Sequence, residues 1–313
     1  MFMHRLTKEL LGASVVVILL LVAWSVSTMP HQPVTAPSPS SSTPLRVIAA
    51  ENFWGSIAAQ IGGDKAHITS IVTDPNADPH EYESSIQTAI AFSRANYIIE
   101  NGAGYDSWVQ NLLSAESRPG QKVLNIATLL GKKNGDNPHF WYDPNYVETV
   151  SAQIEKDYIA LDPQDAPYFQ NNYQTFQSSL AGYVHDITQI KQQYSGVNVA
   201  STESIFVYMA QATGLNLISP SAFMQAISEG NDPPAQSVVD FQNQLKSGEA
   251  KLLVYNKQTV TPITTTMLAL AQQYHVPVVG ITETVQPPDM PFQDWMQNEL
   301  TAIMQALHTA TGK

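Results

Sequence analysis

Short apolar runs rich in Val and Ile alternate with helical stretches from Leu45 onward. Most of the runs have four to six residues and are bounded by polar turns, which is typical of strands buried on both faces of a parallel sheet. The pattern predicts an α/β fold with two lobes, each with a four-stranded, mainly parallel sheet flanked by helices. The candidate strands are Leu45–Ala50, Ile68–Thr73, Tyr97–Glu100 and Val123–Ile126, followed by Asn198–Ser201, Asn216–Ile218, Leu252–Tyr255 and Val278–Ile281.

A helical pattern separates the two sets of strands. Apolar residues between Tyr168 and Ile190 recur at steps of three and four, which places them on one helix face. We expect one unbroken helix near Pro163–Tyr194, about 45 Å long, within a linking segment at 162–195. Asp162 before a proline is a typical helix start, and Gly196 is a typical stop. The helix would join an N-terminal lobe at 45–161 to a C-terminal lobe at 196–313.

The chain begins with features of an export segment at residues 1–29. Arg5 and Lys8 precede an almost wholly apolar run, Leu10–Ser27, which is long enough to be either a cleaved signal peptide or an uncleaved membrane anchor. In both cases the basic residues stay inside, so the rest of the chain is expected outside the cytoplasmic membrane. Residues 30–44, rich in Pro and Ser, predict a flexible tether.

Composition limits the chemistry. Apolar residues make up 43% of the 313 residues and charged residues 13%, which is enough apolar content for a sizeable core. The formal net charge of −12 argues against a nucleic-acid partner. The chain has no cysteine, so a bound metal would need His, Asp or Glu as ligands.

Two of the eight histidines stand out. His80 and His139 each follow a proline, and each lies in a loop beyond the carboxyl end of an expected strand, where α/β sheets usually place ligands. The alternative is that both are turn histidines packed against neighbouring aromatic rings. Because the two lie in the same half of the chain, we interpret them as half of a metal site.

Two carboxylates in the second half are candidates for the other ligands. Glu203 and Glu283 lie just past expected strands, at an edge that can face the loops of the first lobe. The alternatives are a carboxylate favoured by a helix N-terminus for Glu203 and a solvated loop acid for Glu283.

At these residues the chain resembles a known family, the zinc- and manganese-binding solute receptors of ABC importers of the TroA/ZnuA type. The resemblance runs from about Leu45 to the C-terminus. Its motifs are DPHEYE at Asp78–Glu83, NPHFWYDP at Asn137–Pro144, TESIFVYMAQATGL at Thr202–Leu215, ISEGNDPP at Ile227–Pro234, LLVYNKQ at Leu252–Gln258 and PVVGITETVQPP at Pro277–Pro288.

The resemblance implies four ligands in a cleft between lobes: His80, His139, Glu203 and, where the family usually has Asp, Glu283. It further implies a monomeric, extracytoplasmic binding protein rather than an enzyme. Its cargo would be one divalent transition-metal ion, Zn²⁺ or Mn²⁺, and its partner the permease of an ABC importer.

Three departures from the family pattern affect this interpretation. The chain lacks the cysteine that many members use for lipid attachment, and Ser84–Thr88 replaces a proline-rich continuation. The loop at Gly120–Asn137 contains no histidine, although zinc-type members often have a His-rich loop there. That absence and the carboxylate of Glu203 favour manganese, whereas the Irving–Williams order favours zinc.

Two other function classes remain open. A zinc hydrolase would need an open coordination position and a general base, typically in an H-E-x-x-H motif, which does not occur here. A surface adhesin with a structural metal is the second alternative.

Overall fold

The strands form two separate parallel sheets, as expected. The structure, a computed structural model, describes residues 43–76, 79–116 and 119–313, and all elements below belong to one unit, Thr43–Lys313. The expected leader and most of the expected tether lie outside the described residues. Within those three ranges, no helix has both the length and the hydropathy needed to cross a bilayer.

The first sheet, here called the N-sheet, has the strand order β2-β1-β3-β4, and its three pairings are parallel. Its strands are β1 (Leu45–Glu51), β2 (Ala66–Val72), β3 (Tyr97–Glu100) and β4 (Lys122–Asn125). The second sheet, here called the C-sheet, repeats this order as β6-β5-β7-β8, again parallel. Its strands are β5 (Asn198–Ser201), β6 (Asn216–Leu217), β7 (Leu253–Asn256) and β8 (Val278–Ile281).

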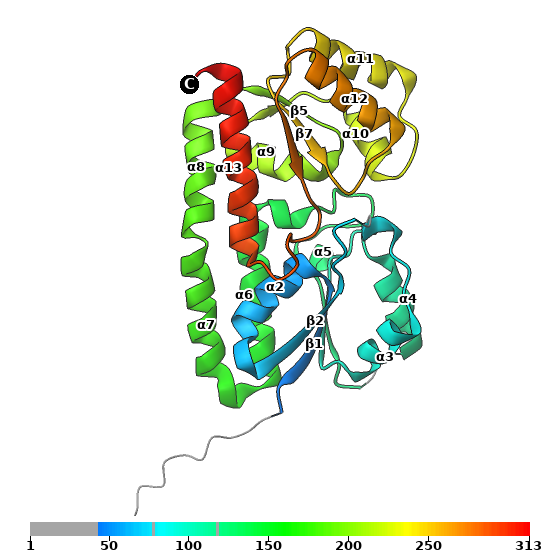
Figure 1. Ribbon diagram of the computed structural model, residues 1–313. Helices are drawn as coiled ribbons and strands as arrows, with labels where there is room; N and C mark the ends of the chain where they lie inside the picture. The colour runs from blue at the N-terminus through cyan, green and yellow to red at the C-terminus, as the bar shows by residue number, and fades with distance from the viewer. Residues whose placement is uncertain (1–42, 77–78, 117–118) are drawn as a thin grey trace, which may run out of the picture. The chain divides into compact units, whose positions relative to one another are not determined.

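Helices cover both faces of each sheet (Figure 1). The α-helices are α2 (Asn52–Gly62), α3 (Ile86–Arg94), α4 (Ser107–Glu116), α5 (Ile126–Leu129), α6 (Pro144–Leu161), α7 (Ala166–Ser179), α8 (Ala181–Tyr194), α9 (Val207–Thr213), α10 (Ser221–Ser228), α11 (Ala235–Lys246), α12 (Pro262–Gln273) and α13 (Phe292–Thr311). Short 3₁₀ turns are η1 (Gly63–Lys65), η2 (Pro79–Glu81), η3 (Phe140–Tyr142), η4 (Pro163–Asp165) and η5 (Ser204–Phe206).

Alternation along the strands divides the buried side chains between separate cores. On β1, Val47 joins the largest cluster, which continues from the N-sheet to the C-sheet beneath α6, α8 and α13. The next residue, Ile48, points to the other face and packs with Phe92 of α3 and Trp108 of α4. Successive strand residues face opposite sides of a sheet, so strands covered on both faces are apolar at nearly every position. This explains why the apolar runs identified the strands.

The expected single linking helix is interrupted, which corrects the prediction of an unbroken one. Residues 163–165 form the 3₁₀ turn η4, α7 begins only at Ala166, and Leu180 separates α7 from α8. The ψ angle of Leu180 is −9°, so one turn departs from α geometry, but its N–H still bonds Phe176 O at 3.2 Å. The apolar periodicity continues across this residue and therefore gave no sign of the interruption.

Helix α2 connects the two halves of the fold by a stripe of amide and hydroxyl side chains. The side chain of Asn52 makes two hydrogen bonds with the backbone of Val285, with the amide Nδ2 donating to Val285 O at 3.1 Å and Oδ1 accepting from Val285 N at 2.9 Å. One and two turns further along α2, Ser56 and Gln60 bond residues at the start of α13. These contacts hold the segment after β8 against the N-sheet side of the molecule.

We expect Asn52→Ala to lower the free energy of unfolding by roughly 2–4 kcal/mol, because it leaves two buried backbone groups of Val285 without partners. Urea denaturation of the metal-free protein measures this change. Asn243→Ala, on the exposed side of α11, is the control and should change it by no more than about 0.5 kcal/mol. Equal stability of the two variants would contradict the assigned role of Asn52.

Candidate metal centre

The four predicted ligands lie in loops that follow strands of the two sheets. His80 is in η2, after β2, and His139 directly precedes η3, in the connection between β4 and α6. Glu203 follows β5, and Glu283 follows β8. Loops at the carboxyl ends of parallel strands share one edge of a sheet, which explains how residues far apart in the chain can approach one another here.

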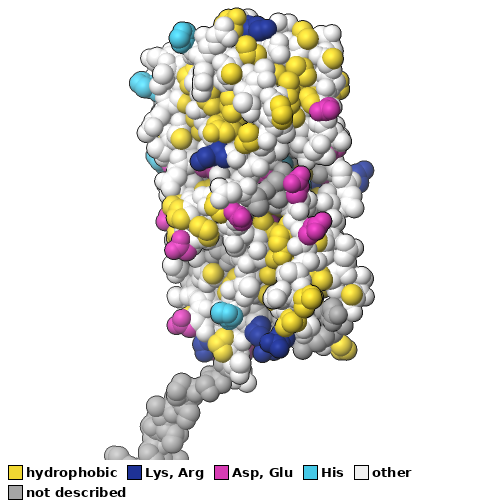
Figure 2. Space-filling view, turned by 45° about the vertical axis from the view of Figure 1, so that its right-hand side comes forward, with side chains coloured by type: hydrophobic (Ala, Val, Ile, Leu, Met, Phe, Trp, Pro, Cys, Tyr) yellow, Lys and Arg dark blue, Asp and Glu magenta, His cyan; other side chains and the backbone are white. Residues whose placement is uncertain are grey.

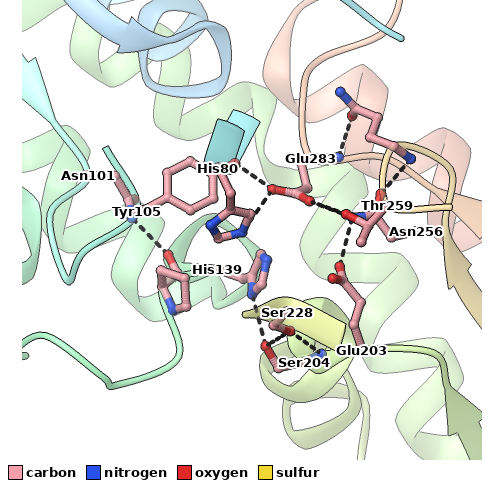
Figure 3. Close-up of polar contacts among 12 residues, drawn as sticks. His80, Asn101, Tyr105, His139, Glu203, Ser204, Ser228, Asn256, Thr259 and Glu283 are labelled. Carbon is pink, nitrogen blue, oxygen red and sulfur yellow. Dashed lines mark hydrogen bonds and ion pairs between the residues drawn. The ribbon is translucent and has the colours of Figure 1, made fainter. Parts of the chain in front are cut away.

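Three of the four residues converge (Figure 3). His80, His139 and Glu283 each offer a ligand atom, and these atoms lie within 4.8 Å of one another. His80 Nε2 is 3.5 Å from Glu283 Oε2, and the two imidazole centroids are 6.0 Å apart. The group joins side chains from the N-sheet side with a carboxylate from the C-sheet side, although Glu283 lies 203 positions after His80 in the chain.

Glu203 lies outside this group of three. Its side chain is fully buried, and its Oε1 accepts a 2.8 Å hydrogen bond from Asn256 Nδ2. The same amide nitrogen donates to Glu283 Oε1 at 2.5 Å, so Asn256 bridges the two carboxylates. Glu203 is therefore linked to the group through the Asn256 amide, but it is not one of the three side chains whose ligand atoms converge.

Asn137 determines which ring nitrogen of His139 can bind a cation. Asn137 Oδ1 accepts from His139 N at 3.1 Å and lies 2.7 Å from His139 Nδ1, while Asn137 Nδ2 donates to Ser204 O. Because the Asn137 oxygen is an acceptor, Nδ1 must carry the proton, which leaves the lone pair on Nε2. His139 Nε2 is buried and has no hydrogen-bond partner among the described residues.

Burial keeps this imidazole neutral. His139 has no exposed surface, and desolvation together with the neighbouring His80 lowers its pKa well below the ordinary value for histidine. His80 differs, because 22% of its side chain is exposed. His80 is therefore the most exposed of the three converging side chains.

Three uncharged side chains orient the loop of Glu283. Tyr105 OH donates to Glu283 Oε2 at 2.7 Å, and Asn256 donates to the other oxygen. Gln258 Oε1 accepts from the backbone N–H groups of Glu283 and Thr284 at 2.8 and 3.0 Å. Sequence reasoning assigned no role to these three residues. The YNKQ motif contains two of them, and the position of Asn256 at the end of a strand was the available signal.

Further buried carboxyl groups surround the centre. Burial, followed by the charge of Glu100, raises the pKa of Asp106 to about 7. Burial, followed by Asp106, raises the pKa of Glu51 well above its ordinary value, and Glu283 contributes in the same direction. These groups hold protons at acidic pH.

On the face drawn in Figure 2, several acidic side chains also gather at mid-height, which suits attraction of cations.

The donor set fits a transition metal. Two imidazoles and carboxylate oxygens suit zinc, manganese or ferrous iron, whereas calcium and magnesium favour all-oxygen sites. The orphaned, buried Nε2 of His139 is the observation that favours a metal most directly, because an imidazole nitrogen without a partner is costly in a protein interior.

Residues 47–306 match the sequence model of the ZnuA family, described as the zinc-uptake complex component A, periplasmic. The chain belongs to the ZnuA family. This confirms the resemblance drawn from the motifs. The four-ligand assignment within the family site stays a prediction.

Relatives in this family differ in the metal that their names give. The chain is 25% identical to the manganese-binding lipoprotein MntA of Halalkalibacterium halodurans over 210 residues, 64% of this chain and 68% of that protein. It is 25% identical to the iron ABC transporter substrate-binding lipoprotein MtsA of Streptococcus pyogenes serotype M1 over 263 residues, 76% and 78% of the two chains.

Solved structures agree with the fold. A mutant, manganese-bound periplasmic metal binding protein from Candidatus Liberibacter asiaticus aligns with a TM-score of 0.71 at 18% sequence identity. The alignment covers 84% of this chain and 99% of that one. At this identity the likeness concerns the ZnuA-type arrangement of two parallel sheets and not the site residues.

The lowered pKa of His139 predicts how the metal-free protein responds to acid. The folded pKa lies below the unfolded value of about 6.5, so the unfolded chain binds more protons and stability falls as pH drops below 6.5. Relative to His139→Gln, which cannot titrate, the wild type should lose up to about 1.4 kcal/mol per pH unit. Urea denaturation of both chains between pH 7 and 5 measures the difference. A constant difference across this range would show that His139 titrates normally.

Proposed function

We propose that this protein binds one divalent transition-metal ion, zinc or manganese, outside the cytoplasmic membrane and delivers it to the permease of an ABC importer. The observation that carries the proposal is the buried convergence of His80, His139 and Glu283 from the two sheets. Membership of the ZnuA family supports the same function.

We assign Glu203 as the fourth ligand, because it is buried beside the group and shares the Asn256 donor with Glu283. Two histidines and two carboxylates complete a four-ligand site for a zinc-like ion. One copy of the chain supplies all four side chains, and we propose that it acts as a monomer.

The relatives support the transport role. Their names describe manganese and iron ABC transporter substrate-binding lipoproteins, and one structural neighbour was solved with cadmium. A lipoprotein is held at the membrane by a lipid on a cysteine, but this chain has no cysteine. We propose that the apolar segment at residues 10–27 either anchors the protein or directs its export.

The site supports capture better than catalysis. A hydrolytic zinc site needs an open coordination position and a general base held near it. In this chain the carboxylate nearest to the histidines, Glu283, is bonded by Tyr105 and Asn256 and faces His80 directly, which suits a ligand. No observation favours an adhesin.

Removing either histidine should weaken metal binding strongly while the fold persists. We expect His80→Ala and His139→Ala to lower the affinity for zinc by more than about 100-fold, since loss of an outer partner alone costs 10–100-fold. Competition titration against a chromophoric chelator measures the affinity, and circular dichroism checks the fold. His275→Ala, at an exposed turn, is the matched control and should bind like the wild type. Wild-type affinity in both site variants would refute the assignment.

Metal affinity should also depend on pH through the two imidazoles. Both must be neutral to bind a cation, so protons compete with the metal for the imidazole nitrogens, and a free histidine has a pKa of about 6.5. We therefore expect the zinc affinity to fall as pH drops from about 6 to 5, as measured by the same titration. In His80→Asp the loss over this interval should be smaller. An affinity that does not change between pH 7 and 5 would argue against imidazole ligation.

A further inference from the structure

Asn256 lies at the end of β7, between the two candidate carboxylate ligands (Figure 3). This residue is 1% exposed. Its Nδ2 donates to Glu203 Oε1 at 2.8 Å and to Glu283 Oε1 at 2.5 Å. One neutral amide therefore contacts both of the carboxylates that would bind the ion.

The orientation of this amide follows from the hydrogen bond that its oxygen accepts. Asn256 Oδ1 accepts a 2.9 Å hydrogen bond from the backbone N–H of Gln258. A backbone N–H can only donate, so the oxygen must face it and the NH₂ group must face the carboxylates. The two hydrogens of the NH₂ group face the two carboxylate oxygens and Thr259 Oγ1, which lies 3.0 Å from Nδ2.

The two oxygens of Glu283 are in different surroundings. Oε1 accepts from Asn256 Nδ2 and also from Thr259 Oγ1 at 3.3 Å, which uses both of its lone-pair directions. Oε2 faces His80 Nε2 at 3.5 Å and accepts a 2.7 Å hydrogen bond from the Tyr105 hydroxyl. Oε2 is therefore the oxygen that faces His80, whereas Oε1 is hydrogen-bonded to Asn256 and Thr259 on the C-sheet side.

We propose that Asn256 is a specificity-determining residue, which limits Glu203 and Glu283 to one metal-bonding oxygen each and thereby favours zinc over manganese. The inference rests on the proposed function and specifies zinc as the preferred metal ion. Two imidazole nitrogens and two single carboxylate oxygens make four donors, the number that zinc prefers in a tetrahedral site. Manganese suits oxygen-rich sites with more donors, which carboxylates provide when both of their oxygens bind.

The test compares zinc and manganese affinities of the wild type and Asn256→Ala by chelator competition at one pH. Removal of the amide takes the Asn256 donor away from Oε1 of both carboxylates and leaves only the longer 3.3 Å contact of Thr259 Oγ1 on Glu283 Oε1 among the contacts described above, so the site can offer more oxygens to manganese. We expect the ratio of zinc to manganese affinity to fall by about tenfold, within the range measured when outer partners of metal ligands are removed. Equal losses for both ions, or an unchanged ratio, would overturn the role of Asn256.

Asn125→Ala is the matched control. Asn125 ends β4 as Asn256 ends β7, donates to the buried Glu100 at 2.9 Å, and accepts from Thr128 N at 2.7 Å. It contacts none of the four candidate ligands in these hydrogen bonds. We expect Asn125→Ala to keep the wild-type ratio, and a fall equal to that of Asn256→Ala would also overturn the proposal.

X-ray absorption of the zinc-loaded wild type gives an answer even if Asn256→Ala does not fold. We expect four nitrogen or oxygen donors at about 2.0–2.1 Å. Five or six donors would mean that the carboxylates bind through both oxygens, which contradicts the inference. A wild type that binds neither ion would instead refute the proposed function itself, so the two failures are distinguishable.

Discussion

Two carboxylates, Glu203 and Glu283, are fully buried at the same edge of the C-sheet. Neighbouring hydrogen-bond donors offset part of the free-energy cost of burying their charge. An ionised carboxylate inside a protein is costly unless opposite charge or hydrogen-bond donors surround it. Asn256 supplies neutral donors to both, and Tyr105 adds a phenolic donor from the N-sheet side. A divalent cation supplies the opposite charge that these neutral groups lack. The need to balance two buried negative charges thus connects the fold to the capture of a metal.

The strands and the candidate ligands were predictable from the sequence for related reasons. Strands covered on both faces are apolar at nearly every position, as Val47 and Ile48 illustrate by joining different cores. Glu203 and Glu283 each come two residues after such a run, so they must lie at the carboxyl edge of the C-sheet. The break at Leu180 was not predictable, because one residue with altered ψ leaves the apolar periodicity of the helix intact.

The roles of Asn256, Gln258 and Tyr105 depend on which loops meet in space, and composition and spacing contain no such information. Tyr105 approaches Glu283 across 178 positions of the chain. The sequence could show that Glu203 was a carboxylate and that a His-rich loop was missing, and both features favoured manganese. It could not show that a neutral amide occupies one oxygen of each carboxylate. The coordination preference of a site therefore depends on its outer partners as much as on the ligand types.

The contacts of α2 also bear on how the chain acquires its structure. Asn52 and Val285 are separated by 233 positions, so their hydrogen bonds close a loop that contains most of the folded chain. Such contacts form late, because loop-closure entropy must be overcome before the contact stabilises anything. The contacts of α2 with the segment after β8 can therefore form only once that segment has been synthesised, so the N-terminal half of the chain cannot reach its final packing on its own.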